Sequence, residues 1–200
     1  MTAHDPDDRA TRQQASRLDS FLEEKAFKSR YIVLTGEIND RVAASVVTRL
    51  IALASDSDKP INFLISSPGG HVESGDAIHD TIKFVRVPVN MIGTGWVGSA
   101  GVHIYLAAQK ARRFCTENTR FLIHQPSGGG MGTAADIAIA AREIVRARER
   151  LARIIARETG QPLERVTEDI DRDYWMNAAE AIDYGLVSKV IATQDQVPTE

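Results

Sequence analysis

The 200-residue chain is predicted to fold as an α/β domain built on a largely parallel sheet. Short apolar runs, typical of buried strands, alternate with longer stretches in which apolar residues recur every three or four positions, as in helices. Hydrophobic residues make up 43% of the chain and charged residues 26%, which is the balance of a globular protein. The length suits one domain, and the crossovers between its parallel strands are expected to be right-handed.

The first half of the chain carries three predicted strands, at 31–35, 61–65 and 87–92. Apolar residues at helical spacing follow each strand, over 42–51, 72–85 and 102–107. Gly36 ends the first strand, and Asn39 or Asp40 can cap the helix after it. The stretch 93–101 is too rich in glycine for a helix interior and leads into the third helix.

The second half carries shorter strands and the longest helix. We expect strands at 113–115, 121–123 and 186–191, and short helices near 163–170 and 177–183. A glycine loop at 128–130 precedes a helical pattern that runs from about 134 to 158. Gly160 follows this pattern in the position of a C-terminal cap.

Few large apolar side chains occur before residue 21, so residues 1–20 are predicted to form a flexible polar tail. The single domain is expected to span 21–192, with a C-terminal tail at 193–200. The first residues are polar and acidic, without the basic flank and apolar stretch of a secretory signal, and no apolar run is long enough to cross a bilayer. We therefore expect a cytoplasmic protein.

Charge and cysteine content exclude several classes of function. The formal net charge of −3 gives no electrostatic case for a nucleic-acid or anionic-membrane partner. The single cysteine, Cys115, can form neither an intrachain disulfide nor a cysteine-based zinc cage, and is expected to be a buried strand residue.

Three predicted strands end in unusual residues, and sites in open α/β sheets gather at such carboxyl ends. Ser67-Pro-Gly-Gly70 could expose backbone N–H groups as an oxyanion hole, or be only a tight turn. Ser99, in Gly98-Ser-Ala-Gly101, could be a nucleophile or only a helix cap. His124 ends the strand Leu122-Ile-His.

A serine becomes nucleophilic only with a neighbouring base, which a carboxylate usually orients. Among the five histidines His124 is the best candidate, because the end of a strand places its side chain at the cleft. The orienting carboxylate could be Asp169, Asp171 or Asp173, and spacing alone does not choose among them. From the residues alone, a serine-hydrolase triad and a structural interpretation both remain open.

No cofactor or metal is expected in this chain. It has no H-E-x-x-H, EF-hand or P-loop pattern. The letters G-x-G-x-x-G do occur from Gly93 to Gly98. In a dinucleotide-binding domain this motif follows the first strand, and an acidic residue ends the next one. Here the motif follows a later strand and no acidic residue ends the next strand, so a dinucleotide site is not expected.

Several motifs in order resemble the Clp protease proteolytic subunit family. They are Ser67-Pro-Gly-Gly70, the Gly95–Gly101 segment, Ile123-His-Gln-Pro126, Asp171-Arg-Asp173 and the residues from Met176 to Leu186. The similarity covers roughly residues 28–192 and needs no gap between Ser99, His124 and Asp173. It implies that Ser99 is the nucleophile, His124 the base and Asp173 the orienting carboxylate. The oxyanion donors would be the backbone N–H groups of Gly70 and Ala100.

The resemblance also implies a fold and an assembly. The fold would be the crotonase-like βαβ superhelix, with a protruding handle at about 125–159. Seven subunits would form a ring, and two rings would stack into a tetradecamer, with Asp171 and Arg172 at the ring–ring contact. An AAA+ unfoldase would use ATP to feed unfolded polypeptides into the chamber, with protein quality control as the expected role. The arginines of the handle are interleaved with glutamates, which argues against nucleic acid.

The chain departs from the family pattern at three places, and one of them is the apolar N-terminal segment that contacts the ATPase, which is not recognisable in residues 1–25. Gly98 and Ala100 flank the serine where the family usually has alanine and methionine, and glycine can loosen the turn. Asn62 and Leu64 replace aromatic residues of a surface pocket that receives the ATPase, which should weaken docking. Two alternatives stay open: a catalytically weak or silent ring subunit beside an active paralogue, and an acyl-CoA enzyme of the same fold class.

Overall fold

The computed structural model describes residues 18–200. Its seven-stranded sheet has the order β1-β2-β3-β4-β7, with β5 paired to β3 and to β6. All of these pairings are parallel except that of β5 with β6. The strands are β1 (Tyr31–Thr35), β2 (Ile61–Ser67), β3 (Val89–Gly98), β4 (Arg113–Cys115), β5 (Arg120–Ile123), β6 (Tyr174–Met176) and β7 (Lys189–Val190).

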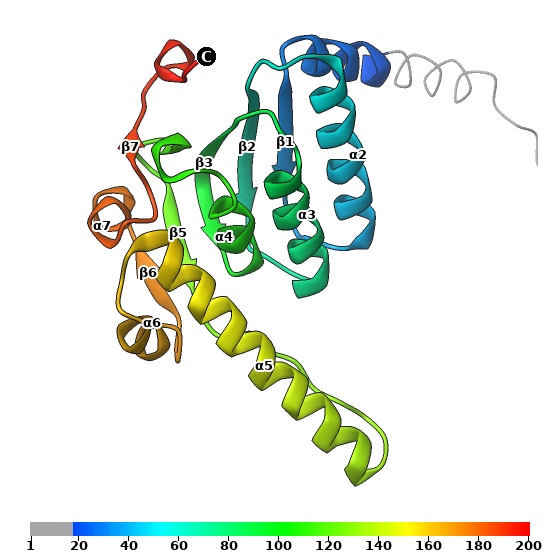
Figure 1. The fold of residues 1–200 in the computed structure, drawn as a ribbon, viewed down its shortest axis with the longest axis vertical. Coiled ribbons are helices and arrows are strands. Elements are labelled where there is room, and N and C mark those ends of the chain that lie inside the picture. Colours follow the sequence, from blue (N-terminus) through cyan, green and yellow to red (C-terminus); the bar gives the residue numbers. More distant parts are fainter. Residues whose placement is uncertain (1–17) are drawn as a thin grey trace, which may run out of the picture.

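The helices are α2 (Asp40–Asp56), α3 (Val72–Phe84), α4 (Ala100–Tyr105), α5 (Ala134–Thr159), α6 (Leu163–Asp169) and α7 (Ala178–Tyr184), with a first helix over 18–28 and short 3-10 turns at Lys110–Arg112 and Gln194–Gln196. Helices α2, α3 and α4 pack side by side along the sheet (Figure 1). The elements α6, β6 and α7 lie on the other side of β5 from α2. The predicted α/β class, with a parallel sheet and one long helix, is confirmed.

Alternation along β2 shows how the sheet builds the core. Ile61, Phe63, Ile65 and Ser67 are buried, and the residues between them are half-buried. Successive side chains of a strand point to opposite faces, so one face of β2 is fully covered. Burying such apolar side chains contributes about 1.5–3 kcal/mol each, so this face of β2 adds to the stability of the core.

Strand β3 is longer than the sequence analysis predicted. The glycine-rich stretch after Ile92 does not leave the sheet, and the strand continues to Gly98. Its first half pairs with β4 and its second half with β5. Gly95 has a φ of +62°, which glycine adopts without strain, and the register with β2 shifts nearby. The glycines therefore bend a strand whose end carries Ser99.

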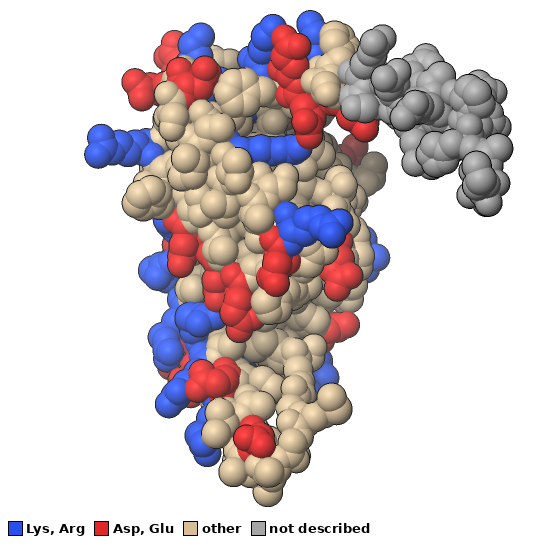
Figure 2. Space-filling view, turned by 90° about the vertical axis from the view of Figure 1, so that its right-hand side faces the viewer, with Lys and Arg blue, Asp and Glu red and all other residues tan. Residues whose placement is uncertain are grey.

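Helix α5 forms a handle that projects away from the body (Figure 1). Its predicted bounds are confirmed to within one residue. Thr133 and Asp136 form a capping box at its start, and Gly160 ends it in the left-handed conformation. Acidic and basic side chains lie next to one another on the handle in Figure 2. Two ion pairs form within this helix, Arg146–Glu143 and Arg153–Glu149.

The sequence analysis misses two elements and overextends one. The helix over 18–28 and the strand β6 were not expected. The last strand is only Lys189–Val190, because the amides of Leu186 and Val187 both bond to the carbonyl of Ala181 and form a turn. Of the tail expected at 1–20, residues 1–17 lie outside the described part, and 18–20 begin the first helix.

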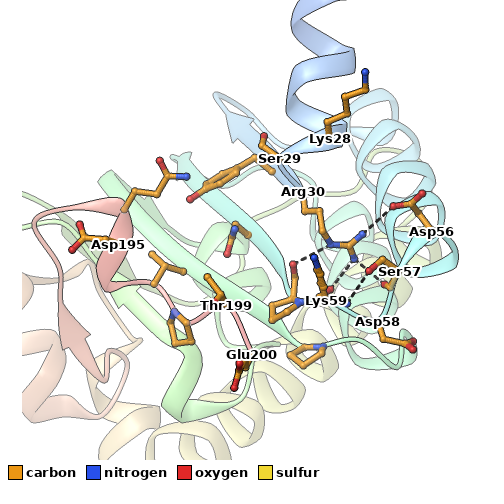
Figure 3. Close-up of a pocket in the computed structure, with 17 residues that line it drawn as sticks. Lys28, Ser29, Arg30, Asp56, Ser57, Asp58, Lys59, Asp195, Thr199 and Glu200 are labelled. Atoms are coloured by element: carbon orange, nitrogen blue, oxygen red, sulfur yellow. Dashed lines mark hydrogen bonds and ion pairs between the residues drawn. The ribbon is translucent and has the colours of Figure 1, made fainter.

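The C-terminal residues pack onto the sheet beside a hollow of about 1400 Å³ (Figure 3). Val197 is buried, and the Asn90 amide donates to the carbonyl of Pro198. Across the hollow, the buried Arg30 guanidinium donates to the carbonyls of Leu53, Ser57, Lys59 and Pro60. Arg30 therefore ties the end of α2 to the start of β1.

Candidate active site

The carboxyl ends of β2, β3 and β5 meet at one edge of the sheet. Ser99 follows β3, and its amide donates to the carbonyl of Leu122 in β5 at 2.9 Å. Gly98 lies opposite Leu122 in the parallel register, so His124 leaves β5 close to Ser99. Parallel pairing thus brings together two residues that lie 25 positions apart in the numbering.

Ser99 has a backbone conformation that residues other than glycine rarely adopt. Its φ is +54° and its ψ is −122°, between the end of β3 and the start of α4. Such conformations cost about 1–3 kcal/mol and cluster at functional sites. Gly69 packs directly on this turn, since a Cβ added there would lie 2.6 Å from the Ser99 Cβ. The turn therefore depends on glycine at position 69.

His124 is held by Asp173. The Nδ1 atom of His124 lies 2.9 Å from Oδ1 of Asp173. This contact arises because β6 runs antiparallel to β5, with Ile123 opposite Tyr174. A proton on Nδ1 that is donated to the carboxylate leaves Nε2 as the acceptor on the other side of the ring.

The other two candidate carboxylates have different partners. Asp169 accepts a hydrogen bond from the Tyr184 hydroxyl at 2.8 Å. Asp171 lies 3.4 Å from an Arg148 nitrogen and 3.3 Å from its neighbour Arg172. The Asp171 carbonyl and carboxylate also accept from the Gln125 side chain, next to His124. Of the three, Asp173 is the one that contacts His124 in the described structure.

Ser99 and His124 line one small pocket. Its other walls come from three helices, through Val72 of α3, Val102 and His103 of α4, and Leu151 and Ile155 of α5. Apart from His103 these wall residues are apolar. About 30 Å³ of free space remains between these walls, and their chemistry favours an apolar group beside the serine.

Two backbone amides near Ser99 are suited to bind an oxyanion. Ile38 and Gly70 form a parallel bridge. Its two hydrogen bonds run from the Ile38 N–H to the Gly69 carbonyl and from the His71 N–H to the Ile38 carbonyl, so Gly70 itself makes neither. The Gly70 N–H consequently points away from Ile38. Ala100 is the first residue of α4, where an N–H has no carbonyl one turn earlier. A Cβ on Gly69 would lie 3.0 Å from the Ala100 nitrogen, so the two segments are in contact.

One feature beside the pocket was missed by the sequence analysis. The His103 and His79 rings stack with centroids 4.2 Å apart, and both residues are buried. Asp76 lies 2.9 Å from His103 and also pairs with Arg150 of the handle. Asp76 and His79 are spaced three residues apart on α3, which is the signal that could have indicated a shared face.

Residues 18–200 hold neither a metal-binding cluster nor a membrane-spanning helix. No group of three or more His, Cys, Asp or Glu side chains lies close enough there to hold a metal ion. Within the same range, no helix is long and apolar enough to cross a membrane.

Comparison with known proteins identifies the family of this chain. The Clp protease family model matches residues 13–194. The ATP-dependent Clp protease proteolytic subunit 3 of Rhizobium etli is 56% identical over 88% of this chain and 90% of its own. Subunit 2 of Gluconobacter oxydans is 59% identical over 86% and 78%. The solved structure of ClpP1 from Listeria monocytogenes superposes with a TM-score of 0.81, at 46% identity, and covers 88% of this chain and 99% of its own. The chain therefore belongs to the Clp protease family and is one of its proteolytic subunits.

Proposed function

We propose that this subunit is an active serine endopeptidase that hydrolyses peptide bonds in unfolded polypeptides. In this proposal Ser99 is the nucleophile, His124 the general base and then acid, and Asp173 the orienting carboxylate. The observation that carries it is the 2.9 Å contact of Asp173 with His124, on a histidine that shares a pocket with Ser99.

In the proposed reaction these groups act in sequence. The Ser99 Oγ attacks the peptide carbonyl while His124 Nε2 takes its proton, and the carbonyl oxygen becomes an oxyanion. The N–H groups of Gly70 and Ala100 would receive that charge, and losing one such donor typically costs about 10²–10³ in rate. His124 then gives its proton to the leaving amine. A water, activated by the same histidine, cleaves the acyl-serine.

The proposal extends to the assembly. Heptameric rings stacked into a tetradecamer would enclose the site, with Asp171 and Arg172 at the ring–ring contact. In the single chain, Arg172 is almost fully exposed, and Asp171 bonds to Gln125 beside His124. A ring contact at this pair would therefore act on the segment that carries the base.

An AAA+ unfoldase is the proposed partner, and it would use the ATP, because the proposed reaction in this chain needs no cofactor. Protein quality control in the cytoplasm is the proposed role. The single cysteine is buried and unpaired, which suits a reducing compartment.

A fluorophosphonate probe tests the nucleophile. Ser99 Oγ would displace fluoride from phosphorus, with its proton passing to His124, and intact mass would then show one adduct per chain. The Ser99→Ala variant should show none. Ser127→Ala is the matched control, because it removes an exposed hydroxyl three residues from His124 and should keep the adduct. An assembled wild-type oligomer without an adduct would refute the proposal and favour a silent ring subunit.

A further inference from the structure

Asp76 joins the three helices that form the pocket beside Ser99. It lies on α3, its Oδ1 is 2.9 Å from the Nε2 of His103 on α4, and its Oδ2 pairs with Arg150 on α5. The same three helices supply the pocket walls. One carboxylate thus lies within ion-pair distance of a side chain from each of the two elements that face α3.

The charges around Asp76 keep it ionised. Burial acts to raise the pKa of this carboxyl, but His103 and then Arg150 outweigh that effect and lower it. Three quarters of the Asp76 side chain is covered, whereas half of the Arg150 side chain is exposed. An ion pair with such an exposed partner contributes little to overall stability. Loss of the Asp76–Arg150 ion pair should therefore leave the fold intact.

The contact with Arg150 bears directly on the pocket wall. Leu151 follows Arg150 in sequence, and Ile155 lies one turn further along the same face of α5. Both residues line the pocket. The handle is also held to α3 about two turns further along, where Glu158 pairs with Lys83, and the Asp76–Arg150 pair is the ion pair to α3 that lies next to Leu151. Holding Arg150 in place therefore holds the neighbouring Leu151 and Ile155, which form this wall of the pocket.

We propose that Asp76 is a positioning residue that sets the shape of this pocket, and with it the apolar side chain accepted next to the bond that is cut. The inference rests on the proposed peptidase function. In it, Asp76 holds His103 and Arg150 together, and the distance between Leu151 and Val102 sets the width of the pocket. Asp76 touches neither the substrate nor the reacting atoms.

The test compares peptides that carry leucine or alanine before the cut bond. In Asp76→Ala and Arg150→Met, the ratio of kcat/KM for leucine over alanine should fall about fivefold to tenfold, mostly through KM. Arg150→Lys keeps the positive charge and should retain much of the preference for leucine. The rate of fluorophosphonate labelling at Ser99 should stay within about twofold, because the nucleophile and its base are untouched.

Arg153→Met is the matched control. Arg153 lies on the same helix and pairs with Glu149 at 3.7 Å, without reaching α3, so its loss should change neither peptide selectivity nor labelling. An unchanged leucine-to-alanine ratio in Asp76→Ala would overturn the inference. So would a fall in labelling parallel to the fall in peptide cleavage, because that pattern indicates general damage to the site.

Hydrogen exchange supplies a readout that does not depend on activity. Backbone amides over 149–156 should exchange several times faster in Arg150→Met than in the wild type or in Arg153→Met. Equal protection in all three proteins would overturn the inference even in an inactive chain. A wild type with no adduct and no cleavage, but with this difference in exchange, would refute the proposed function and leave the positioning role supported.

Discussion

Asp173 Oδ1 lies 2.9 Å from the Nδ1 atom of His124, although the two residues are 49 positions apart in the chain. The contact depends on the three-residue strand β6, which pairs antiparallel with β5. In the chain, β6 follows the handle α5 and the short helix α6. The orientation of the proposed base is therefore determined by the segment that follows the handle, and Asp171 lies on that same segment.

The first prediction concerns Asp173→Asn. An amide in place of the carboxylate can present its NH₂ to Nδ1 and favour the tautomer that cannot accept the serine proton. We expect kcat for peptide hydrolysis to fall on the order of 10³–10⁴-fold, with the oligomer intact. Asp169→Asn is the matched control, since Asp169 bonds to Tyr184 instead, and it should keep most of the activity.

The second prediction concerns the contact between Gly69 and the turn at Ser99. Gly69→Ala would place a Cβ 2.6 Å from the Ser99 Cβ at a φ of +101°, so the turn has to move. We expect labelling of Ser99 by the fluorophosphonate to slow at least tenfold, because a shift of about 1 Å at a reacting group can cost 10²-fold.

Gly36→Ala separates backbone strain from this contact. Gly36 also has a positive φ, +80°, but nothing lies within 4 Å of the position of its added Cβ. This variant should lose about 1 kcal/mol of stability and label at the wild-type rate. Equal slowing in both variants would contradict the role given to Gly69.

The sequence predicted most of the fold because most elements carry local signals. The handle, for example, has a capping residue, helical spacing and a terminal glycine, and its bounds were predicted to within one residue. Strand β6 has only three residues, and Trp175 within it is partly exposed, so no apolar pattern marks it. The extension of β3 was hidden by its glycines, which are tolerated because β5 pairs with them.

The candidate site, like the fold, could be predicted only in part from the sequence. Ser99 and His124 could be picked out because each follows a strand, and strand ends converge. The choice of Asp173 over Asp169 and Asp171 could not be made from spacing, because it depends on the antiparallel pairing of β6 with β5. Asp76 escaped notice for a similar reason: its partners come from two helices that lie far along the chain.

The third prediction concerns the thiol of Cys115. Burial raises the pKa of this thiol to about 11, against a smaller opposing effect of Thr119. At pH 8 only about one thiol in a thousand is then ionised, and the side chain is fully covered. A disulfide reagent should leave the folded protein unmodified for hours and modify one thiol per chain in guanidinium. Rapid modification of the folded protein would contradict the buried position in β4.

The last prediction concerns the stability of the protein at mildly acidic pH. Burial, and then the neighbouring His103, lower the pKa of His79 from its ordinary value near 6.5, although Asp80 opposes the shift and Lys83 adds to it. The unfolded chain binds a proton near pH 6.5, whereas folded His79 resists protonation until lower pH. Its contribution to the free energy of unfolding is therefore complete above that value and decreases as the pH falls below it.

Urea unfolding at pH 7.5 and 5.5, at one protein concentration, measures this loss. We expect His79 to account for up to about 1 kcal/mol of the decrease, since one pKa unit corresponds to about 1.4 kcal/mol. His79→Phe should remove that part, because phenylalanine stacks on His103 without binding a proton. The lowered pKa values of Asp76 and Glu158 affect stability only at lower pH, because carboxyls begin to titrate below that range. An identical decrease in the wild type and His79→Phe would therefore mean that His79 does not cause the loss of stability in acid.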